Sequence, residues 1–165
     1  MISEVIKLLA CLMLLGLLAV GFAEITDADE IKPRLTKYDR IHAIFDATGS
    51  KHPAVMAVAA LATKRPDIIT GIAVKESNGT PYAVGDGGKS KGAWQVQAQH
   101  WGKVPVSAVA QALQADRILD ELVAAEQRGV LRWRKVLATY NGGPRRPRVS
   151  YAYADRVLRI ARIVG

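Results

Sequence analysis

The sequence predicts a mainly α-helical domain, a bundle of helices with a glycine-rich loop or a small β element over residues 78–97. Two observations support this prediction. Apolar residues recur three and four positions apart through most of residues 38–164, which is the spacing of one helix face. Residues 78–92 interrupt that pattern with five glycines and one proline, a composition typical of loops.

The length and charge of the chain limit the number of domains and the classes of partner that it can have. Its 165 residues suffice for one domain with a sizeable core, because a domain of about 150 residues buries roughly 70% of its unfolded surface. The 23 lysines and arginines exceed the 15 acidic residues and give a net charge of +8. Such a charge favours polyanionic partners, and on charge alone nucleic acid, anionic lipid and acidic cell-wall polymers all remain open.

Residues 1–23 predict a signal peptide or an N-terminal membrane anchor. The uninterrupted apolar run from Leu8 to Ala23 is 16 residues long, whereas a spanning helix needs about 20. The run ends in "GFA", whose small residues suit cleavage after Ala23. We expect export across the inner membrane into the periplasm or cell envelope, with membrane contact only through this segment, whether it is cleaved or retained.

The first half of the remaining chain predicts a linker and three helices. Residues 24–37 are polar, contain Pro33 and are expected to be the linker. Helices are expected within 38–49, 52–64 and 65–77, the last two with a proline near the first turn. The residues expected on their apolar faces include Ile41, Ile44, Phe45, Ile68, Ile69, Ile72 and Ala73.

The second half predicts three more helices, within 106–129, 130–141 and about 150–164. The short stretch "AWQVQ", residues 93–97, is expected to be extended. The apolar residues at near-helical spacing in these helices are Val109, Leu113, Ile118, Leu119, Leu122, Leu131, Val136, Leu137, Val157, Leu158, Ile160 and Ile163.

No metal or organic cofactor is expected. Cys11 is the only cysteine and lies in the N-terminal apolar run, so the rest of the chain offers no disulfide, thiolate ligand or thiol nucleophile. The three histidines, His42, His52 and His100, are scattered along the sequence and form no metal-binding motif.

A single acid, Glu76, stands near the end of the helix predicted at 65–77. The dipole at a helix C-terminus disfavours a negative charge, and burial among apolar neighbours raises the pKa of a carboxyl further. A carboxyl that stays protonated near neutral pH is what a general acid requires. From position alone, an ordinary exposed glutamate at a helix end remains the alternative.

Two later stretches add candidate binding residues. In "SKGAWQV", residues 90–96, Trp94 offers a flat apolar surface and Gln95 can both donate and accept hydrogen bonds. An aromatic ring with an amide complements a sugar, which has apolar faces and hydroxyl edges. In "ATYNGGP" the pair Tyr140 and Asn141 stands where a helix ends and can point into a cleft. Core packing for Trp94 and a helix C-cap for the Tyr-Asn pair are the plainer alternatives.

Together these residues resemble the Slt-type lytic transglycosylase family, which has a lysozyme-like α+β fold. The resemblance covers roughly residues 53–160, and the order and spacing of the motifs make it specific although each motif alone is weak. It implies a catalytic domain over 38–165, a helical bundle around a substrate cleft, acting on the glycan strands of peptidoglycan. The matches are Glu76-Ser77, Gly92-Ala93-Trp94-Gln95 and Thr139-Tyr140-Asn141-Gly142-Gly143-Pro144.

Three positions depart from the family pattern. The family commonly has Leu-Met where this chain has Ala93-Trp94, and Ala where it has Thr139. Asp86 lies among the glycines of the loop, as in some phage and secretion-associated lysozyme-like enzymes, and is a candidate second carboxylate. These departures leave the position of the substrate and the reaction product open.

The resemblance implies that one acid serves both chemical steps. Most glycosidases use two carboxylates, but here the substrate would supply the second group. Protonated Glu76 would donate to the glycosidic oxygen between N-acetylmuramic acid and N-acetylglucosamine, and the 2-acetamido carbonyl would stabilise the positive centre. The Glu76 carboxylate would then take the proton of the muramyl 6-hydroxyl, and a 1,6-anhydro ring would close.

The same match assigns supporting roles. Tyr140 would hydrogen-bond near Glu76 and the acetamido group, Asn141 and Gln95 would hold the sugar, and Ser77 would contact substrate or brace Glu76. The remaining substrate-binding candidates are Trp94, Ser90 and Tyr153; turn stabilisation is the alternative for Ser90, and core packing is the alternative for Tyr153.

Other functions remain open. A hydrolytic muramidase, such as a phage endolysin, would keep the fold and use Asp86 to place a water. A basic nucleic-acid-binding protein is a weaker alternative, because no nucleic-acid motif accompanies the basic residues. A non-catalytic scaffold in a secretion or phage machinery is the third. The six arginines and single acidic residue between Gly142 and Gly165 suit a polyanionic wall as partner.

Overall fold

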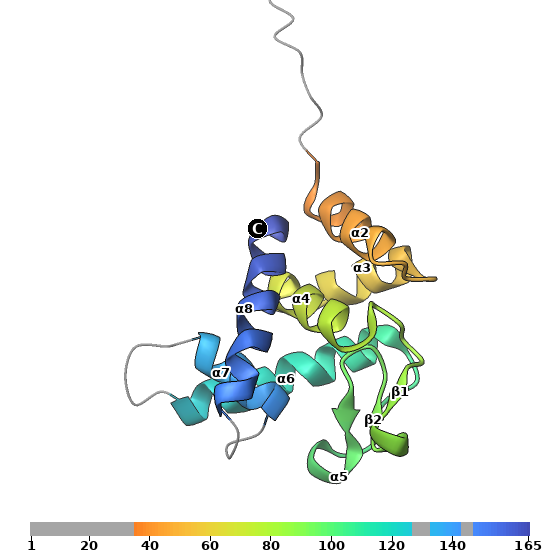
Figure 1. Ribbon diagram of the computed structural model, residues 1–165. Coiled ribbons are helices and arrows are strands. Elements are labelled where there is room, and N and C mark those ends of the chain that lie inside the picture. The colour runs from red at the N-terminus through yellow and green to blue at the C-terminus, as the bar shows by residue number, and fades with distance from the viewer. Residues whose placement is uncertain (1–34, 127–132, 143–146) are drawn as a thin grey trace, which may run out of the picture. The chain divides into compact units, whose positions relative to one another are not determined.

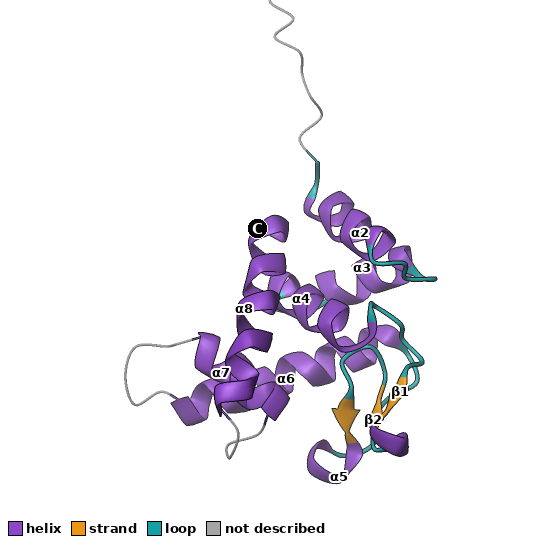
Figure 2. Cartoon of the chain, viewed as in Figure 1, coloured by secondary structure: helices purple, strands orange, loops and turns teal. Residues whose placement is uncertain are grey.

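The helices of the computed structural model account for most of the residues it describes, which are 35–126, 133–142 and 147–165 (Figures 1 and 2). The mainly α prediction is confirmed. The predicted signal or anchor at 1–23, and residues 24–34 of the predicted linker, lie outside the described residues. The elements are α2 (Lys37–Ala47), α3 (Pro53–Leu61), α4 (Pro66–Ser77), β1 (Val84–Gly85), the 3-10 helix η1 (Asp86–Gly88), β2 (Ser90–Lys91), β3 (Val96–Gln97), α5 (Ala98–Trp101), α6 (Ala108–Glu126), α7 (Trp133–Gly142) and α8 (Pro147–Val164).

Local sequence signals set the boundaries of the first helices. The Thr36 hydroxyl accepts from the backbone N–H of Asp39, and the Asp39 carboxylate accepts from that of Thr36, so a reciprocal cap starts α2 inside the predicted linker. Pro53 and Pro66 open α3 and α4, where a missing N–H costs no helical bond. Asn78 closes α4 in the left-handed conformation with φ 53°.

The glycine-rich stretch forms a small antiparallel sheet with the order β1-β2-β3. Val84 pairs with Lys91 across the first ladder, and Ser90 pairs with Gln97 across the second. Of the residues 93–97 that were predicted to be extended, only Val96 and Gln97 form a strand, β3, at one edge of the sheet. Residues 93–95 form a turn, in which Gln95 has a left-handed φ of 47°. Figure 1 shows the sheet and α5 together on one side of the helices, with α7 and α8 on the other.

The buried core lies where α4 packs against α8, with α3 against α6 and α7 against α8. Gly71 makes the first of these contacts close, because a Cβ there would lie 2.7 Å from the backbone oxygen of Val157. The contact brings Tyr153 of α8 near the C-terminal end of α4, which carries Glu76. The largest fully buried side chains include Phe45, Ile69, Ile72, Ile118, Leu119, Leu137 and Val157.

The predicted faces of two helices need correction. Val109 and Leu113 are 36% and 48% exposed, because α6 buries a stripe of smaller and amide residues instead. Ile163 is 61% exposed, and its neighbour Val164 takes the buried position at the end of α8. The α6 residues in the buried stripe are Ala108, Gln111, Ala112, Gln114, Ala115, Asp116, Ile118 and Leu119.

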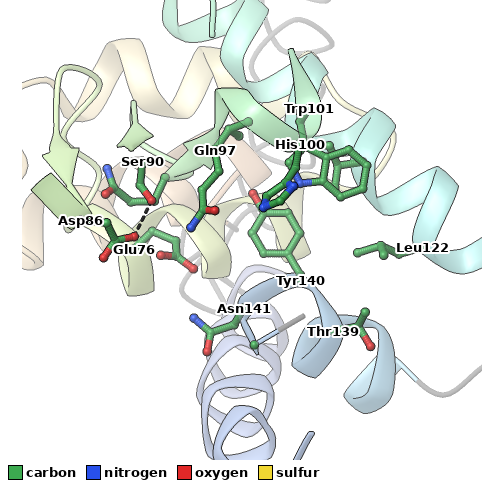
Figure 3. A pocket seen from close by; sticks show the side chains of 14 residues that line it. Glu76, Asp86, Ser90, Gln97, His100, Trp101, Leu122, Thr139, Tyr140 and Asn141 are labelled. Carbon is green, nitrogen blue, oxygen red and sulfur yellow. Dashed lines mark hydrogen bonds between the residues drawn. The ribbon is translucent and has the colours of Figure 1, made fainter. Parts of the chain in front are cut away.

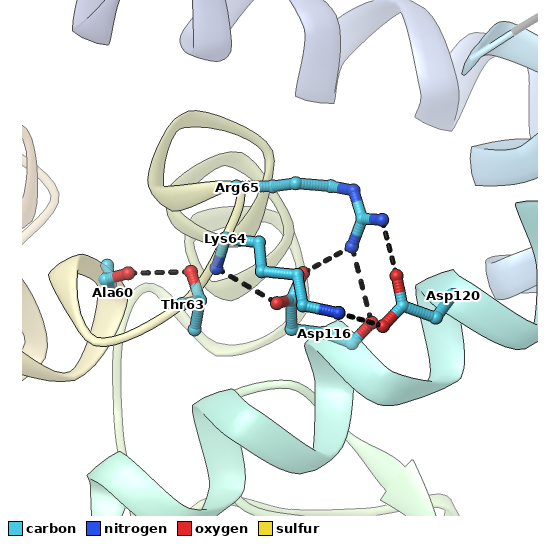
Figure 4. Close-up of polar contacts among 6 residues, drawn as sticks. All are labelled: Ala60, Thr63, Lys64, Arg65, Asp116 and Asp120. Carbon is cyan, nitrogen blue, oxygen red and sulfur yellow. Dashed lines mark hydrogen bonds and ion pairs between the residues drawn. The ribbon is translucent and has the colours of Figure 1, made fainter.

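An ion-pair network fastens the junction of α3 and α4 to α6 (Figure 4). The Arg65 guanidinium contacts Asp116 at 2.6 Å and also pairs with Asp120, while the backbone N–H of Lys64 donates to Asp116 at 3.0 Å. The Asp116 side chain is 5% exposed, so its bonds to Arg65 and Lys64 replace the water that burial removes. The same Arg65 guanidinium stacks 5.5 Å from the ring of Trp133 in α7.

Across the three described ranges, no helix combines the length and the apolarity that crossing a membrane would require.

Candidate active site

An open pocket of about 800 Å³ lies between the sheet and the helices (Figure 3). The end of α4 contributes Glu76, the first hairpin contributes Asp86 and Ser90, and α7 contributes its last four residues. Segments far apart in the sequence thus build one concave surface of the size that small ligands occupy. The lining residues are Glu76, Asp86, Ser90, Gln95, Val96, Gln97, His100, Trp101, Ile118, Leu122, Thr139, Tyr140, Asn141 and Gly142.

Glu76 is half-buried in the last turn of α4, at the pocket wall. Burial raises the pKa of its carboxyl above the ordinary value and outweighs the opposing effects of Tyr153, Asn141 and Lys75, which lower it. The negative charge of Asp86 adds to the rise. Glu76 therefore holds its proton to a higher pH than an exposed glutamate, as a general acid must.

Two tyrosines flank this carboxyl and differ in what their hydroxyls contact. The buried Tyr140 hydroxyl donates to the backbone oxygen of Trp94 at 3.0 Å. The Tyr153 hydroxyl is also buried, and it completes no hydrogen bond among the described residues although it lies close enough to Glu76 to affect its pKa. Burial and the Glu76 charge raise the pKa of both phenols, so both stay neutral. Tyr153 packs in the core, the plainer of its two predicted roles, but its polar end faces the acid.

Ser77 and Gln95 hold the loops around the pocket. The Ser77 hydroxyl donates to the backbone oxygen of Ala93 at 2.9 Å and accepts from the N–H of Thr80, which ties the end of α4 to the following loop. Ser77 is not among the pocket-lining residues, so its geometry fits bracing of Glu76, one of its two predicted roles. The Gln95 amide lines the pocket and donates to the backbone oxygen of Gly92 at 2.9 Å.

Asp86 and Ser90 form a pair beside Glu76. The buried Ser90 hydroxyl donates to the Asp86 carboxylate at 2.5 Å, which orients an otherwise exposed acid on the hairpin (Figure 3). Asp86 adopts φ 50°, a left-handed conformation that aspartate tolerates better than most residues. The pocket thus contains two carboxylates, and Figure 3 shows them next to each other.

The role predicted for Trp94 needs correction. Its side chain is 1% exposed, and its Nε1–H donates to the backbone oxygen of Ile69 at 2.9 Å. The ring is therefore part of the core and offers no surface to a sugar. The sequence alone could not decide this, because a single aromatic residue beside a loop suits either role.

The structure adds residues that the sequence analysis did not select. Gln97, His100 and Trp101 line the pocket from β3 and α5, and Thr139, noted only as a departure from the family pattern, lines it from α7. One signal was present: "QVQAQHW" places amide, imidazole and indole groups directly after Gln95. Figure 3 shows Asn141 and the Gln97 amide next to Glu76, and it shows the ring of Tyr140 just below His100.

Among the described residues, no three His, Cys, Asp or Glu side chains gather closely enough to hold a metal ion. Comparison of the chain with protein-family models, with curated proteins and with solved structures finds no match.

Proposed function

We propose that this chain is a peptidoglycan lytic transglycosylase with a lysozyme-like fold, and that Glu76 is its general acid and base. The supporting observation is a half-buried glutamate with a raised pKa in the wall of an open pocket. The residues of the three sequence motifs converge there: Glu76 from the first, Gln95 from the second, Tyr140 and Asn141 from the third.

In the first step, the Glu76 carboxyl donates its proton to the oxygen that links N-acetylmuramic acid to N-acetylglucosamine. The bond from that oxygen to the muramyl C1 breaks, and N-acetylglucosamine leaves with a free 4-hydroxyl. The acetamido carbonyl oxygen of the muramyl ring bonds to C1, and the positive charge moves from C1 onto the acetamido group. No second enzyme carboxylate is required, in contrast to most glycosidases.

In the second step, the Glu76 carboxylate accepts the proton of the muramyl 6-hydroxyl. The 6-oxygen attacks C1, the bond from C1 to the acetamido oxygen breaks, and a 1,6-anhydro ring closes. The proton balance returns Glu76 to its starting form, and no water is consumed. Asn141 and Tyr153 stabilise the carboxylate between the steps, since both lower the pKa of Glu76.

One observation favours a second candidate, a hydrolytic muramidase of phage endolysin type. Asp86 lines the same pocket as Glu76, acts on its pKa and is oriented by Ser90. A carboxylate in that position can activate a water for attack at C1, as in inverting glycosidases.

Mass spectrometry of the products separates the two reactions. Purified peptidoglycan is digested with the purified protein, and the released muropeptides are weighed. We expect 1,6-anhydromuramyl ends, lighter by one water than reducing ends. Reducing muramyl ends would instead establish the hydrolase, and a complete absence of released fragments under conditions where a known muramidase succeeds would contradict both.

The proposed location follows from the same function. Peptidoglycan lies outside the inner membrane, so we propose export through residues 1–23 and action alone or within a secretion or phage machinery. N-terminal sequencing of the protein recovered from the cell envelope tests this: a start after Ala23 indicates cleavage, and an intact N-terminus indicates an anchor.

A further inference from the structure

A group of large apolar side chains is exposed on the surface outside the pocket of Glu76, and none of them lines that pocket. Their exposed fractions range from 36% to 80%, so water meets a large part of each side chain. They come from α3, from the loop before β1 and from the start of α6. We call this group the apolar face, and its members are Val55, Val58, Tyr82, Val106, Val109 and Leu113.

Three contacts hold the segments of the apolar face together. The ring of His52 lies edge-on to the ring of Tyr82, with the centroids 6.0 Å apart, which joins the start of α3 to the loop. The buried Gln111 amide donates to the backbone oxygens of Pro81 and Val106 at 3.1 and 3.2 Å, which joins the loop to the start of α6. α3 also packs against α6, and Figure 1 shows the starts of both helices on the side away from α7. The six side chains therefore lie in neighbouring parts of one surface.

α3 is apolar on its outer side as well as on its inner side. Met56 and Ala60 pack in the core, whereas Val55 and Val58, almost one turn apart, are 50% and 53% exposed. A helix that is apolar all round is normally covered on every side. Exposed apolar surface that spans several elements marks a place where a protein or a membrane binds. The outer side of α3 therefore indicates a contact surface.

The segments that form the apolar face contain no acidic residue. Residues 47–66, 77–85 and 87–115 include lysines and one arginine but neither aspartate nor glutamate. Lys51 and Lys103, which are close in sequence to members of the apolar face, are exposed. Apolar and aromatic side chains bordered by lysines match a lipid surface with anionic headgroups. Two copies that paired through this face would bring like charges together, which argues against a dimer.

The sequence places an apolar segment a short distance along the chain from this domain. Residues 8–23 are the apolar run predicted to be a signal or an anchor, and the 11 residues 24–34 separate it from Leu35, the first described residue. A fully extended chain of that length spans at most about 40 Å. An anchor that is retained would therefore keep Leu35 within that distance of a bilayer. This connection favours a lipid surface over an acidic partner protein.

We propose that the apolar face docks on an anionic phospholipid surface. The valine side chains enter the boundary between headgroups and acyl chains, the Tyr82 ring lies at the level of the headgroups, and Lys51 and Lys103 contact lipid phosphates. Membrane contact then extends beyond residues 1–23, to which the sequence analysis confined it. The docking goes beyond the proposed catalysis and does not depend on it.

An environment-sensitive fluorophore on the full chain tests this contact. Cys11 is the only cysteine, so Cys11→Ser protein accepts a single label either at Val58→Cys or at the matched control Ala152→Cys, an exposed position of α8. Vesicles made of equal parts phosphatidylcholine and phosphatidylglycerol are then added. We expect a blue shift and a rise in emission at position 58 and no change at position 152. With phosphatidylcholine alone the change at position 58 should be smaller, because the lysines lose their anionic partners.

A label at Val109→Cys reports on the same face from α6. Adding Val55→Ser and Val58→Ser should remove most of the emission change at position 109, because the apolar area that enters the lipid is lost. Adding Lys51→Gln and Lys103→Gln should reduce that change in the anionic vesicles and leave it unaltered in phosphatidylcholine. All these substituted side chains are exposed, and circular dichroism checks that each variant keeps its fold.

Three results would overturn the docking surface. Equal emission changes at positions 58 and 152 would show adsorption without a preferred face. Unchanged emission at both 58 and 109 would show that the face stays in water, whether or not the protein floats with the vesicles. A blue shift without lipid that grows with protein concentration would mean that the face pairs with a second copy instead.

Discussion

At the scale of single residues, the proposed chemistry depends on the proton of Glu76. An amide in its place cannot donate that proton, so Glu76→Gln should abolish wall lysis, measured as loss of turbidity of a peptidoglycan suspension. The same change removes a partly buried ionisable group, so the melting temperature should stay near that of the wild type. Glu121→Gln, on an exposed position of α6, is the matched control and should retain full activity. Lysis by Glu76→Gln protein would show that another group is the acid.

Asp86 should influence the pH dependence of the proposed activity. Its negative charge raises the pKa of Glu76, so Asp86→Asn should lower that pKa. In the proposed mechanism the protonated form of Glu76 is the active acid, so activity should fall as pH rises through its pKa. In the transglycosylase, the alkaline limb of kcat/KM against pH should therefore move to lower pH while substantial activity remains. In a hydrolase that uses Asp86 to activate water, the same variant should lose almost all activity.

The two tyrosines beside Glu76 should respond differently to loss of the hydroxyl. Tyr153→Phe removes a group that lowers the pKa of Glu76, so the alkaline limb should move to higher pH with little change in stability. Tyr140→Phe leaves the Trp94 carbonyl without its donor and should cost about 1 kcal/mol or more in the free energy of unfolding. Urea denaturation and a pH–rate profile of both variants check this. Equal effects of the two changes would contradict the assigned roles.

At the scale of elements, the anchoring of α6 to the start of α4 depends unequally on two aspartates. Asp116→Ala removes a 5%-exposed carboxylate. It leaves the backbone N–H of Lys64 without its acceptor and removes the buried partner of Arg65, which still pairs with Asp120, so the change should cost about 2–3 kcal/mol of unfolding free energy. Asp120 has a 38%-exposed side chain, so Asp120→Ala should cost about 1 kcal/mol or less. Denaturant unfolding of both variants tests the order. A larger loss for Asp120→Ala would show that Asp116 is not the main anchor.

The helices were predictable because long elements repeat a pattern, and the shorter elements were not. A two-residue strand such as β1 or β2 contains no full period, and the four-residue α5 contains barely one turn. The buried face of α6 was predicted wrongly because Val109 and Leu113 are more apolar than the alanines that the helix buries, and the most apolar residues were expected to be the buried ones. Close packing against α3 leaves room for small residues on the inner face, and periodicity alone does not measure that room.

At the scale of the whole molecule, a local sequence pattern does not show which side chains become buried, and this explains which site residues could be predicted. Glu76, Gln95, Tyr140 and Asn141 were selected because motifs mark them, and the pocket brings them together. Trp94 and Trp101 are the same residue type seven positions apart, and only the fold decides that one is core and the other lines the pocket. Burial of a single residue depends on contacts between distant segments, which no local pattern records.

The net charge of +8 leads to a prediction about how the whole molecule binds a polyanionic wall. Arg156, Arg159 and Arg162 lie on the exposed surface of α8, and charges exposed to water are screened beyond about 10 Å in 0.1 M salt. Binding of the protein to purified peptidoglycan, measured by co-sedimentation, should therefore weaken as salt rises from about 0.05 to 0.5 M.

A pair of double variants with the same change in net charge shows whether placement matters. Arg159→Glu with Arg162→Glu reverses two charges on α8, and Lys51→Glu with Arg117→Glu reverses two exposed charges elsewhere. If α8 is the face that meets the polyanionic wall, the first pair should weaken co-sedimentation at low salt markedly more than the second. Equal losses would mean that the protein is held near the wall by its total charge, with no preferred face, because attraction that depends only on net charge is indifferent to where the charge lies.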